Sequence, residues 1–197
     1  RTNLSVGITA EKDPGEQFFK NKKKNGFDFY SAHAYYKGGK YVKAVALGDY
    51  QIQIGQGLNL WSGYGFGKTA DVTNIKKNAQ SLKPYTSVDE NRFFRGAAVD
   101  LGYKNWGLTL FGSHKRTDAS VVADSLYEEL EYVSSINITG FHRTTTEIAK
   151  RKNLRETIAG GNLRYEKRNF SLGAAAVYQG YDRAYNKAVL PYNQFDF

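Results

Sequence analysis

Apolar and polar residues alternate one by one along several stretches of this chain, a period typical of β-strands with one apolar face. Between residues 92 and 104, for example, Val99, Leu101 and Tyr103 share one side, and Asp100 lies on the other. The candidate strands span residues 3–8, 30–36, 42–54, 92–104, 106–113, 156–165 and 170–179. This predicts an all-β fold, an antiparallel up-and-down meander of roughly seven strands, most about 9 to 13 residues long, with no parallel pair.

The connections between these strands alternate between very short and very long. Short links are expected at Gly38-Gly39, Lys104-Asn105 and Lys167-Arg168. Long loops are expected at about residues 10–26, 55–91 and 117–154. Outer-membrane barrels have short turns on the periplasmic side and long loops on the extracellular side. The pattern therefore predicts that residues 1–197 form a single region of an outer-membrane β-barrel.

The short links also predict strand pairing, because residues opposite each other in a hairpin share a face. A two-residue link at Lys104-Asn105 pairs Tyr103 with Trp106 and Val99 with Leu110. The link at Lys167-Arg168 similarly predicts the pairs Tyr165 with Phe170 and Leu163 with Leu172. For the first hairpin, a three-residue turn with a bulge at Gly38 and Gly39 would align Tyr36 with Val42.

Alternation divides the strand residues into two faces and a group near the short turns. The expected lipid-facing residues are Val42, Ala46, Tyr50, Val99, Leu101, Leu108, Leu163, Leu172 and Ala176. The expected lumen-facing residues are Lys43, Asp49, Gln51, Asp100 and Arg164. Outward aromatic residues near the short turns are Tyr36, Tyr103, Trp106, Tyr165 and Phe170. Such residues form a girdle at the headgroup level of membrane barrels, although cross-strand aromatic pairs in a soluble sheet offer an alternative.

The composition agrees with a β-rich chain, with 15 Tyr and 12 Phe among 197 residues. No stretch is apolar for the roughly 18 residues that a membrane-spanning helix needs. The absence of cysteine excludes disulfides, thiolate metal sites and cysteine nucleophiles. No methionine occurs even at position 1, so the chain is expected to be a fragment of a longer precursor.

Candidate chemistry is sparse, and no catalytic, cofactor-binding or metal-binding residue is predicted. The run Gly63, Gly65, Gly67, Lys68 and Thr69 resembles a phosphate-binding loop, but Ser62 stands where that motif requires its first glycine. The histidines at positions 33, 114 and 142 are too widely separated for a helical metal motif. The acids at positions 49 and 100 are expected to balance inward-facing lysine and arginine residues rather than to catalyse a reaction.

Charge and local motifs suggest partners for the long loops. The chain has 28 basic and 19 acidic residues, and Lys20, Lys22, Lys23 and Lys24 cluster in the first loop. Such a cluster can contact lipopolysaccharide phosphates, bind nucleic acid or simply be solvated. In the third loop, Thr144 followed by Glu147 predicts a capping box that opens a short helix.

Several sequence blocks resemble a known family. They are GDYQ at 48–51, GQGLNLWSG at 55–63, KPYTSVDENRFFRG at 83–96, GFHRT at 140–144, GGNLRY at 160–165 and PYNQF at 191–195. Over most of the chain these blocks resemble the barrel region of Bacteroidetes helix-hairpin-helix cell-envelope proteins related to the DNA-uptake protein ComEA. The resemblance implies a bacterial outer-membrane location, contact with lipid and lipopolysaccharide, and partners among other envelope proteins. DNA uptake follows only from the family label, because the helix-hairpin-helix part precedes the barrel.

Two classes of function remain open from the sequence. The first is a non-enzymatic outer-membrane barrel acting as a pore, a translocation element or an envelope-assembly component. The second is a soluble or secreted β-rich binding module. Bacterial single-chain barrels have an even number of strands, and this chain has seven candidate strands. We therefore predict that these residues do not close a barrel alone.

Overall fold

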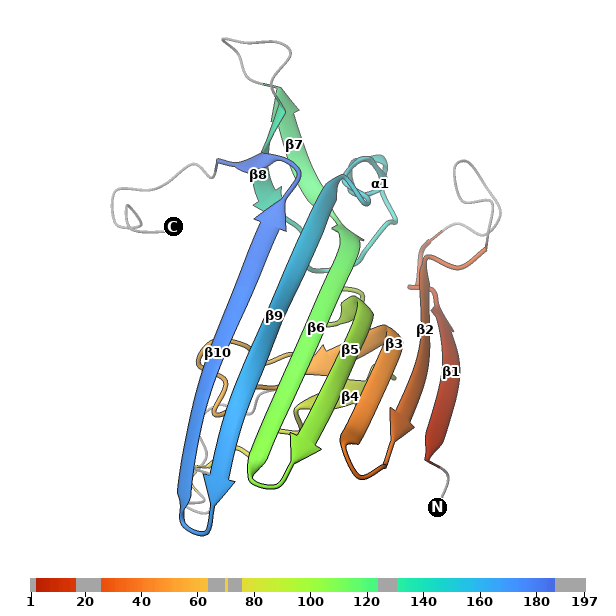
Figure 1. The fold of residues 1–197 in the computed structure, drawn as a ribbon. Coiled ribbons are helices and arrows are strands. Elements are labelled where there is room, and N and C mark those ends of the chain that lie inside the picture. Colours follow the sequence, from red (N-terminus) through yellow and green to blue (C-terminus); the bar gives the residue numbers. More distant parts are fainter. Residues whose placement is uncertain (1–2, 17–25, 64–69, 71–75, 124–130, 187–197) are drawn as a thin grey trace.

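The computed structural model describes residues 3–16, 26–63, 70, 76–123 and 131–186. Its main feature is an antiparallel meander in which seven strands follow the order β1-β2-β3-β5-β6-β9-β10 (Figure 1). They are β1 (Leu4–Glu11), β2 (Phe29–Lys37), β3 (Val42–Ile52), β5 (Phe94–Tyr103), β6 (Trp106–Thr117), β9 (Leu154–Lys167) and β10 (Phe170–Tyr181). The predicted all-β meander is confirmed, with strands of 8 to 14 residues.

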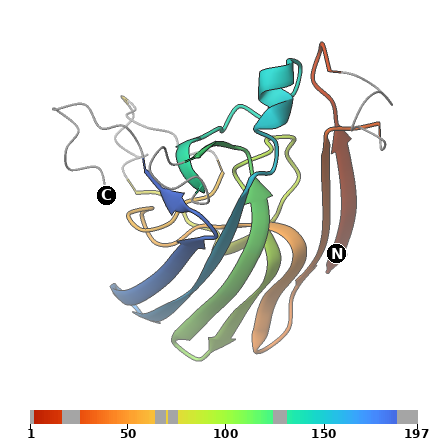
Figure 2. The same ribbon diagram turned by 90° about the horizontal axis from the view of Figure 1, so that it is seen from above.

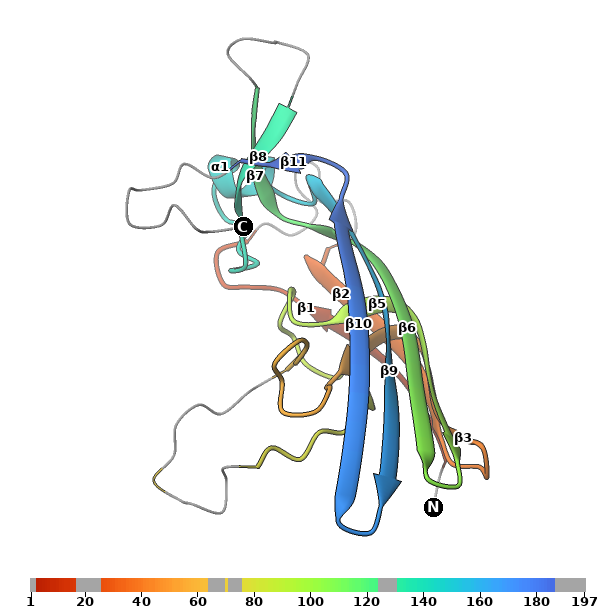
Figure 3. The ribbon, with the colours of Figure 1, turned by 60° about the vertical axis from the view of Figure 1, so that its left-hand side comes forward.

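The sheet is curved, and the segments that follow β3 and β6 lie on its concave side (Figures 2 and 3). We call this side the inner face and the opposite side the outer face. Strands β1 and β10 form the two edges. Within the described residues, β1 pairs only with β2, and β10 pairs only with β9. These residues therefore form an open sheet.

Two of the three short turns follow the predicted pattern of faces. At Lys104-Asn105, Tyr103 lies opposite Trp106 and Val99 opposite Leu110, so that prediction is confirmed. The β9–β10 turn lies one residue later than expected. Its residues are 168 and 169, and the pairs are Leu172 with Tyr165 and Ala174 with Leu163. The predicted partners are therefore wrong, but the faces are unchanged because the register shift is two residues.

The first hairpin differs from the prediction in a way that affects β3 beyond its first residues. Tyr36 lies opposite Val45 rather than Val42, and the β3–β5 pairing contains a bulge between Val42 and Ala44. A bulge adds one residue to one strand, so the side chains that follow it exchange faces relative to a regular alternation. Val42, before the bulge, shares the outer face with its partner Leu101.

The predicted faces of β3 are therefore wrong beyond the bulge. Ala46 and Tyr50 were expected to face lipid, but both are 0% exposed and lie on the inner face. Asp49 and Gln51 were expected to face the lumen, but they alternate with Tyr50 and lie on the outer side. This exchange of faces could not be predicted from the sequence, because Val45 and Leu47 make the second set of alternating β3 residues as apolar as the first.

The inner face contains the main hydrophobic core. Tyr50 stacks on Phe94 with ring centroids 5.8 Å apart, and Phe94 contacts Phe111 at 5.9 Å. The cluster comprises Ala44, Ala46, Tyr50, Ile52, Ile54, Leu82, Phe94, Ala98, Phe111 and Ile158. Leu82 belongs to β4 (Leu82–Pro84), which pairs with the end of β3. The connection between β3 and β5 thus returns to cover the inner face.

The expected long loops contain further short elements. The third includes β7 (Ala119–Ala123), β8 (Glu131–Ile136) and α1 (Thr145–Ala149), and β11 (Ala184–Tyr185) follows β10. The predicted capping box of α1 is confirmed, with Thr144 as N-cap. Strands β7 and β8 are antiparallel, but β11 pairs with β8 in parallel, so the expectation of no parallel pair is wrong. No hairpin turn fixes the relative direction of β8 and β11, because they are not consecutive.

Three sequence features lie outside the described residues. They are the lysine cluster at Lys20, Lys22, Lys23 and Lys24, the segment with Gly65, Gly67, Lys68 and Thr69, and the end of the chain from Pro191 to Phe197. Among the described residues, no helix is both long enough and apolar enough to cross a membrane.

Candidate functional sites: the outer face and a buried histidine cluster

The outer face carries apolar side chains on every strand of the meander. Ile8 on β1 is 81% exposed, and Leu172 on β10 is 63% exposed. The strand register places on this face Leu4, Val6, Ile8, Ala32, Ala34, Val42, Val45, Leu47, Val99, Leu101, Leu108, Leu110, Leu163, Leu172, Ala174 and Ala176. Contiguous apolar surfaces of this extent are rare on water-soluble monomers and mark contact surfaces.

Aromatic residues border this surface at the short-turn end. Tyr36, Tyr103, Trp106, Tyr165 and Phe170 all lie on the outer face in the strand register. Trp106 and Tyr165 contact each other across β6 and β9, with ring centroids 4.8 Å apart. Tyr41 adds a further ring, 5.9 Å from Tyr103. The arrangement places aromatic rings, all amphipathic except that of Phe170, in a row along one edge of the apolar surface.

A second border lies toward the opposite end of the strands. Tyr30 and Tyr178 point outward there and are 42% and 66% exposed. Tyr36 lies six positions after Tyr30, and Tyr178 lies eight positions after Phe170. At about 3.3 Å per residue, these spacings give roughly 20 to 26 Å along the strands.

Polar side chains occupy the outer face near this second border. On β5, Arg95 donates two hydrogen bonds of 2.7 Å to Asp49 on β3. On β6, His114 forms a 2.9 Å hydrogen bond with Thr157 of β9. Along the strand direction the outer face thus changes from aromatic to aliphatic, and then to polar on β3, β5, β6 and β9 or to a single tyrosine on β2 and β10.

The inner face near the short turns is polar. Asp100 accepts hydrogen bonds from Thr109 at 2.8 Å and from Arg164 at 3.2 Å. The Lys43 side chain lies directly against Gly102 on the same side of the sheet. Of the five expected lumen-facing residues, Lys43, Asp100 and Arg164 therefore share the inner face. Contact of any of them with a lumen stays a prediction.

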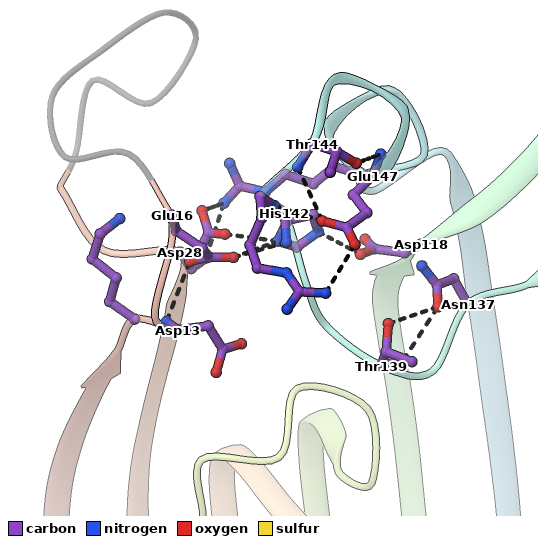
Figure 4. A network of polar contacts seen from close by, with 12 residues as sticks. Asp13, Glu16, Asp28, Asp118, Asn137, Thr139, His142, Thr144 and Glu147 are labelled. Atoms are coloured by element: carbon purple, nitrogen blue, oxygen red, sulfur yellow. Dashed lines mark hydrogen bonds and ion pairs between the residues drawn. The ribbon is translucent and has the colours of Figure 1, made fainter.

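A buried cluster around His142 joins the segments above the sheet (Figure 4). Asp28 immediately precedes β2, Glu16 lies in the segment after β1, and Asp118 separates β6 from β7. His142 lies two residues before Thr144, the N-cap of α1, so the capping box fixes the backbone beside it. Four positions that are far apart in sequence thus meet at one point.

The imidazole of His142 is held on both sides by carboxylates. Its Nδ1 lies 2.7 Å from Oδ2 of Asp28, and its Nε2 lies 2.5 Å from Oδ2 of Asp118. The backbone N–H of His142 donates to Oε1 of Glu16 at 2.8 Å. The His142, Asp28 and Glu16 side chains are at most 1% exposed, and that of Asp118 is 10% exposed. Both ring nitrogens therefore have fixed hydrogen-bond partners and almost no contact with solvent.

The surrounding charges determine the electrostatics of this cluster. Burial alone would lower the pKa of His142, but hydrogen bonds and charge from Asp118 and Asp28 outweigh it and raise the pKa. Burial raises the pKa of the nearby Glu90 to about 7, with His142 opposing the rise and Asp28 among the acids adding to it. Such an arrangement can hold either an imidazolium or a cation that replaces its Nδ1 proton.

Sequence reasoning missed this cluster. Helical spacing links His142 to no other histidine, and its partners Glu16, Asp28 and Asp118 are separated from it by 126, 114 and 24 positions. Glu16, Asp28 and His142 nevertheless present three possible metal-ligand atoms within 4.8 Å of one another. The one sequence signal nearby was the capping box, which places an ordered helix start beside His142.

Comparison of the chain with protein-family models, curated proteins and solved structures gives no match. The resemblance to helix-hairpin-helix envelope proteins therefore stays a prediction from the quoted sequence blocks.

Proposed function

We propose that this chain is a non-enzymatic part of the wall of a bacterial outer-membrane β-barrel, with its outer face against lipid. The observation that carries the proposal is the apolar outer face, bordered by an aromatic row at the short-turn end and by Tyr30 and Tyr178 toward the other end. Membrane barrels have an apolar band about 25 Å tall between two aromatic girdles. The outward aromatic residues at the two ends of β2 and of β10 are roughly 20 to 26 Å apart along the tilted strands, which is comparable to that band.

The direction of the chain supports the same assignment. The short turns lie beyond the aromatic row of Trp106 and Tyr165, and the segments with β4, β7, β8 and α1 lie toward the other end or on the inner face (Figures 1 and 3). In this proposal the short turns are periplasmic and the long segments extracellular, where lipopolysaccharide phosphates are natural partners of basic side chains.

The two sheet edges also bear on the proposal. Strands β1 and β10 each have one edge that pairs with no described strand. In a bilayer, each unsatisfied backbone group costs several kcal/mol, so a lipid-facing sheet has to be closed. We therefore propose that further strands, from this protein or from a partner, complete the wall. The protein would serve as a pore, a translocation element or an envelope-assembly component, and DNA uptake rests on the family resemblance alone.

A soluble binding module is the alternative, and it predicts that the outer face is covered. No described element packs over Val99, Leu101, Leu108, Leu163 or Leu172, which favours the membrane proposal. These residues would otherwise leave a large apolar surface in water.

The absence of cysteine permits a direct test. Leu172→Cys on the outer face and Ser171→Cys on the inner face differ by one position on β10. Each variant is labelled with a fluorophore and reconstituted in vesicles that contain brominated acyl chains. The fluorophore at position 172 should be strongly quenched and the fluorophore at position 171 weakly quenched. Equal quenching, or full solubility of the intact protein in buffer without detergent, would disprove the membrane proposal.

A further inference from the structure

Three potential ligand atoms from separate segments converge beside the His142 ring. They are Nδ1 of His142, Oδ2 of Asp28 and a carboxylate oxygen of Glu16. We propose that these residues bind one divalent transition-metal ion, with Zn²⁺ as the best match. The site lies away from the outer face and does not depend on the membrane assignment.

The distances among the donor atoms fit a common ion after small movements. Nδ1 lies 2.7 Å from Oδ2 of Asp28 and 3.7 Å from Oε1 of Glu16. Ligands bound tetrahedrally at about 2.1 Å from zinc lie about 3.4 Å apart. Shifts of less than about 1 Å in these two pair distances would therefore satisfy both. On binding, the Nδ1 proton that bridges to Asp28 leaves to solvent, and the Nδ1 lone pair bonds the ion.

The other side of the ring is already arranged as in known metal sites. A metal-bound histidine usually donates its second N–H to a carboxylate, which fixes the tautomer and ring orientation. Asp118 provides this acceptor for Nε2 at 2.5 Å. Its other oxygen accepts the backbone N–H of Lys152 at 2.8 Å, so the Asp118 carboxylate is itself held in place. Asp118 is thus a positioning residue for His142.

The carboxylate ligands are also preorganised. Glu16 accepts the backbone N–H of His142 at 2.8 Å and that of Asp13 at 3.4 Å. Arg151 lies 3.3 Å from Oδ1 of Asp28, which leaves Oδ2 as the oxygen that faces the imidazole. These contacts hold one oxygen of each acid toward Nδ1 before any ion arrives.

The donor set determines which ion fits best. Imidazole nitrogen favours Zn²⁺ and other later transition metals, whereas Ca²⁺ and Mg²⁺ prefer oxygen ligands alone. One nitrogen and two carboxylates therefore favour Zn²⁺ over Mn²⁺, and Mn²⁺ over Ca²⁺. The ion would join the segment after β1, the start of β2 and the segment before α1, and so fix the connections above the sheet to one another.

The test uses the protein in detergent micelles after removal of metals with a chelator. Zinc should bind with one equivalent per chain in calorimetry and should raise the thermal unfolding temperature. His142→Gln and Glu16→Gln should each lower the affinity by at least about tenfold. Asp118→Asn should weaken binding by about 10- to 100-fold without removing a ligand. The matched control is His114→Gln, on an exposed histidine that is not part of the cluster, and it should bind zinc normally.

Nitrogen NMR of ¹⁵N-histidine-labelled protein gives a readout that a folding defect cannot imitate. The chain has three histidines, so the ring signals of each can be assigned by substitution. Zinc should convert Nδ1 of His142 to a metal-bound nitrogen while Nε2 keeps its proton. The proposal would be overturned if His142→Gln and Glu16→Gln bound zinc as strongly as the wild type. It would also be overturned if the His142 signals did not change at saturating zinc.

Discussion

Arg95 donates two hydrogen bonds of 2.7 Å to the carboxylate of Asp49, which joins β5 to β3 on the outer face. The same guanidinium donates to the backbone carbonyl of Tyr30 on β2 at 2.8 Å. The Asp49 side chain is 2% exposed, whereas that of Arg95 is 42% exposed. A carboxylate that is so fully buried depends on its cationic partner for stability.

Replacing Arg95 with alanine should therefore destabilise the protein by about 2 to 3 kcal/mol, less than for a fully buried pair because Arg95 is partly exposed. The double variant Asp49→Asn with Arg95→Ala should recover part of this loss, because no unpaired carboxylate remains. Urea unfolding of the four proteins in lipid vesicles measures the coupling. If the losses of the two single variants add up exactly to the loss of the double variant, Arg95 and Asp49 are not energetically coupled.

Tyr50 should contribute to stability through both its ring and its hydroxyl group. The hydroxyl donates to the backbone carbonyl of Gly112 at 2.6 Å, and the side chain is completely buried. Tyr50→Phe should cost about 1 to 2 kcal/mol by leaving that carbonyl without its donor, and Tyr50→Ala about 3 to 5 kcal/mol. Tyr36→Phe, on the exposed outer surface, serves as the control and should change stability by less than about 0.5 kcal/mol. Equal losses for the two Phe variants would show that the Tyr50 hydroxyl group contributes no more to stability than the hydroxyl of an exposed tyrosine.

The strand order and most of the faces could be predicted because period-two alternation and short turns constrain each other. A two-residue turn at Lys104-Asn105 allows one pairing that places Val99 and Leu110 on the same face. The bulge near Lys43 could not be predicted in the same way. Apolar residues occupy both parities of β3, so a one-residue shift leaves the pattern almost unchanged, and only the packing of Tyr50 shows which face is buried.

The His142 cluster could not be predicted from the sequence for a different reason. Alternation describes residues within strands, but His142, Glu16, Asp28 and Asp118 all lie outside the meander strands. Their meeting depends on how the connections fold over the end of the sheet. Only the local part was visible, since the Thr144–Glu147 capping box is encoded within four residues.

The capping box should make the start of α1 sensitive to strong acid. Arg143, together with the backbone N–H groups of Thr144 and Arg143, lowers the pKa of Glu147 to about 2 from the ordinary 4.5. Because the pKa falls on folding, its stabilising effect is complete above about pH 4.5 and is lost as the pH falls toward 2. A carboxyl ¹³C titration should give a midpoint near 2 for Glu147, rising in Arg143→Gln. A midpoint near 4.5 in the wild type would contradict the capping geometry.

The outer face should respond to charge as a lipid-contacting surface does. Leu163 lies on β9 between the aromatic row and the polar end of the outer face, opposite Leu108 and Ala174. Leu163→Lys should lower the free energy of unfolding in lipid vesicles by about 2 to 4 kcal/mol if this position lies near the bilayer midplane. Ser171→Lys, exposed on the inner face of β10, should change it by less than about 0.5 kcal/mol. On a surface in water both substitutions would be nearly neutral, because an exposed leucine gains nothing from lipid. The difference between the two lysine variants therefore measures the lipid contact itself, and two equal values would remove the physical basis of the membrane assignment.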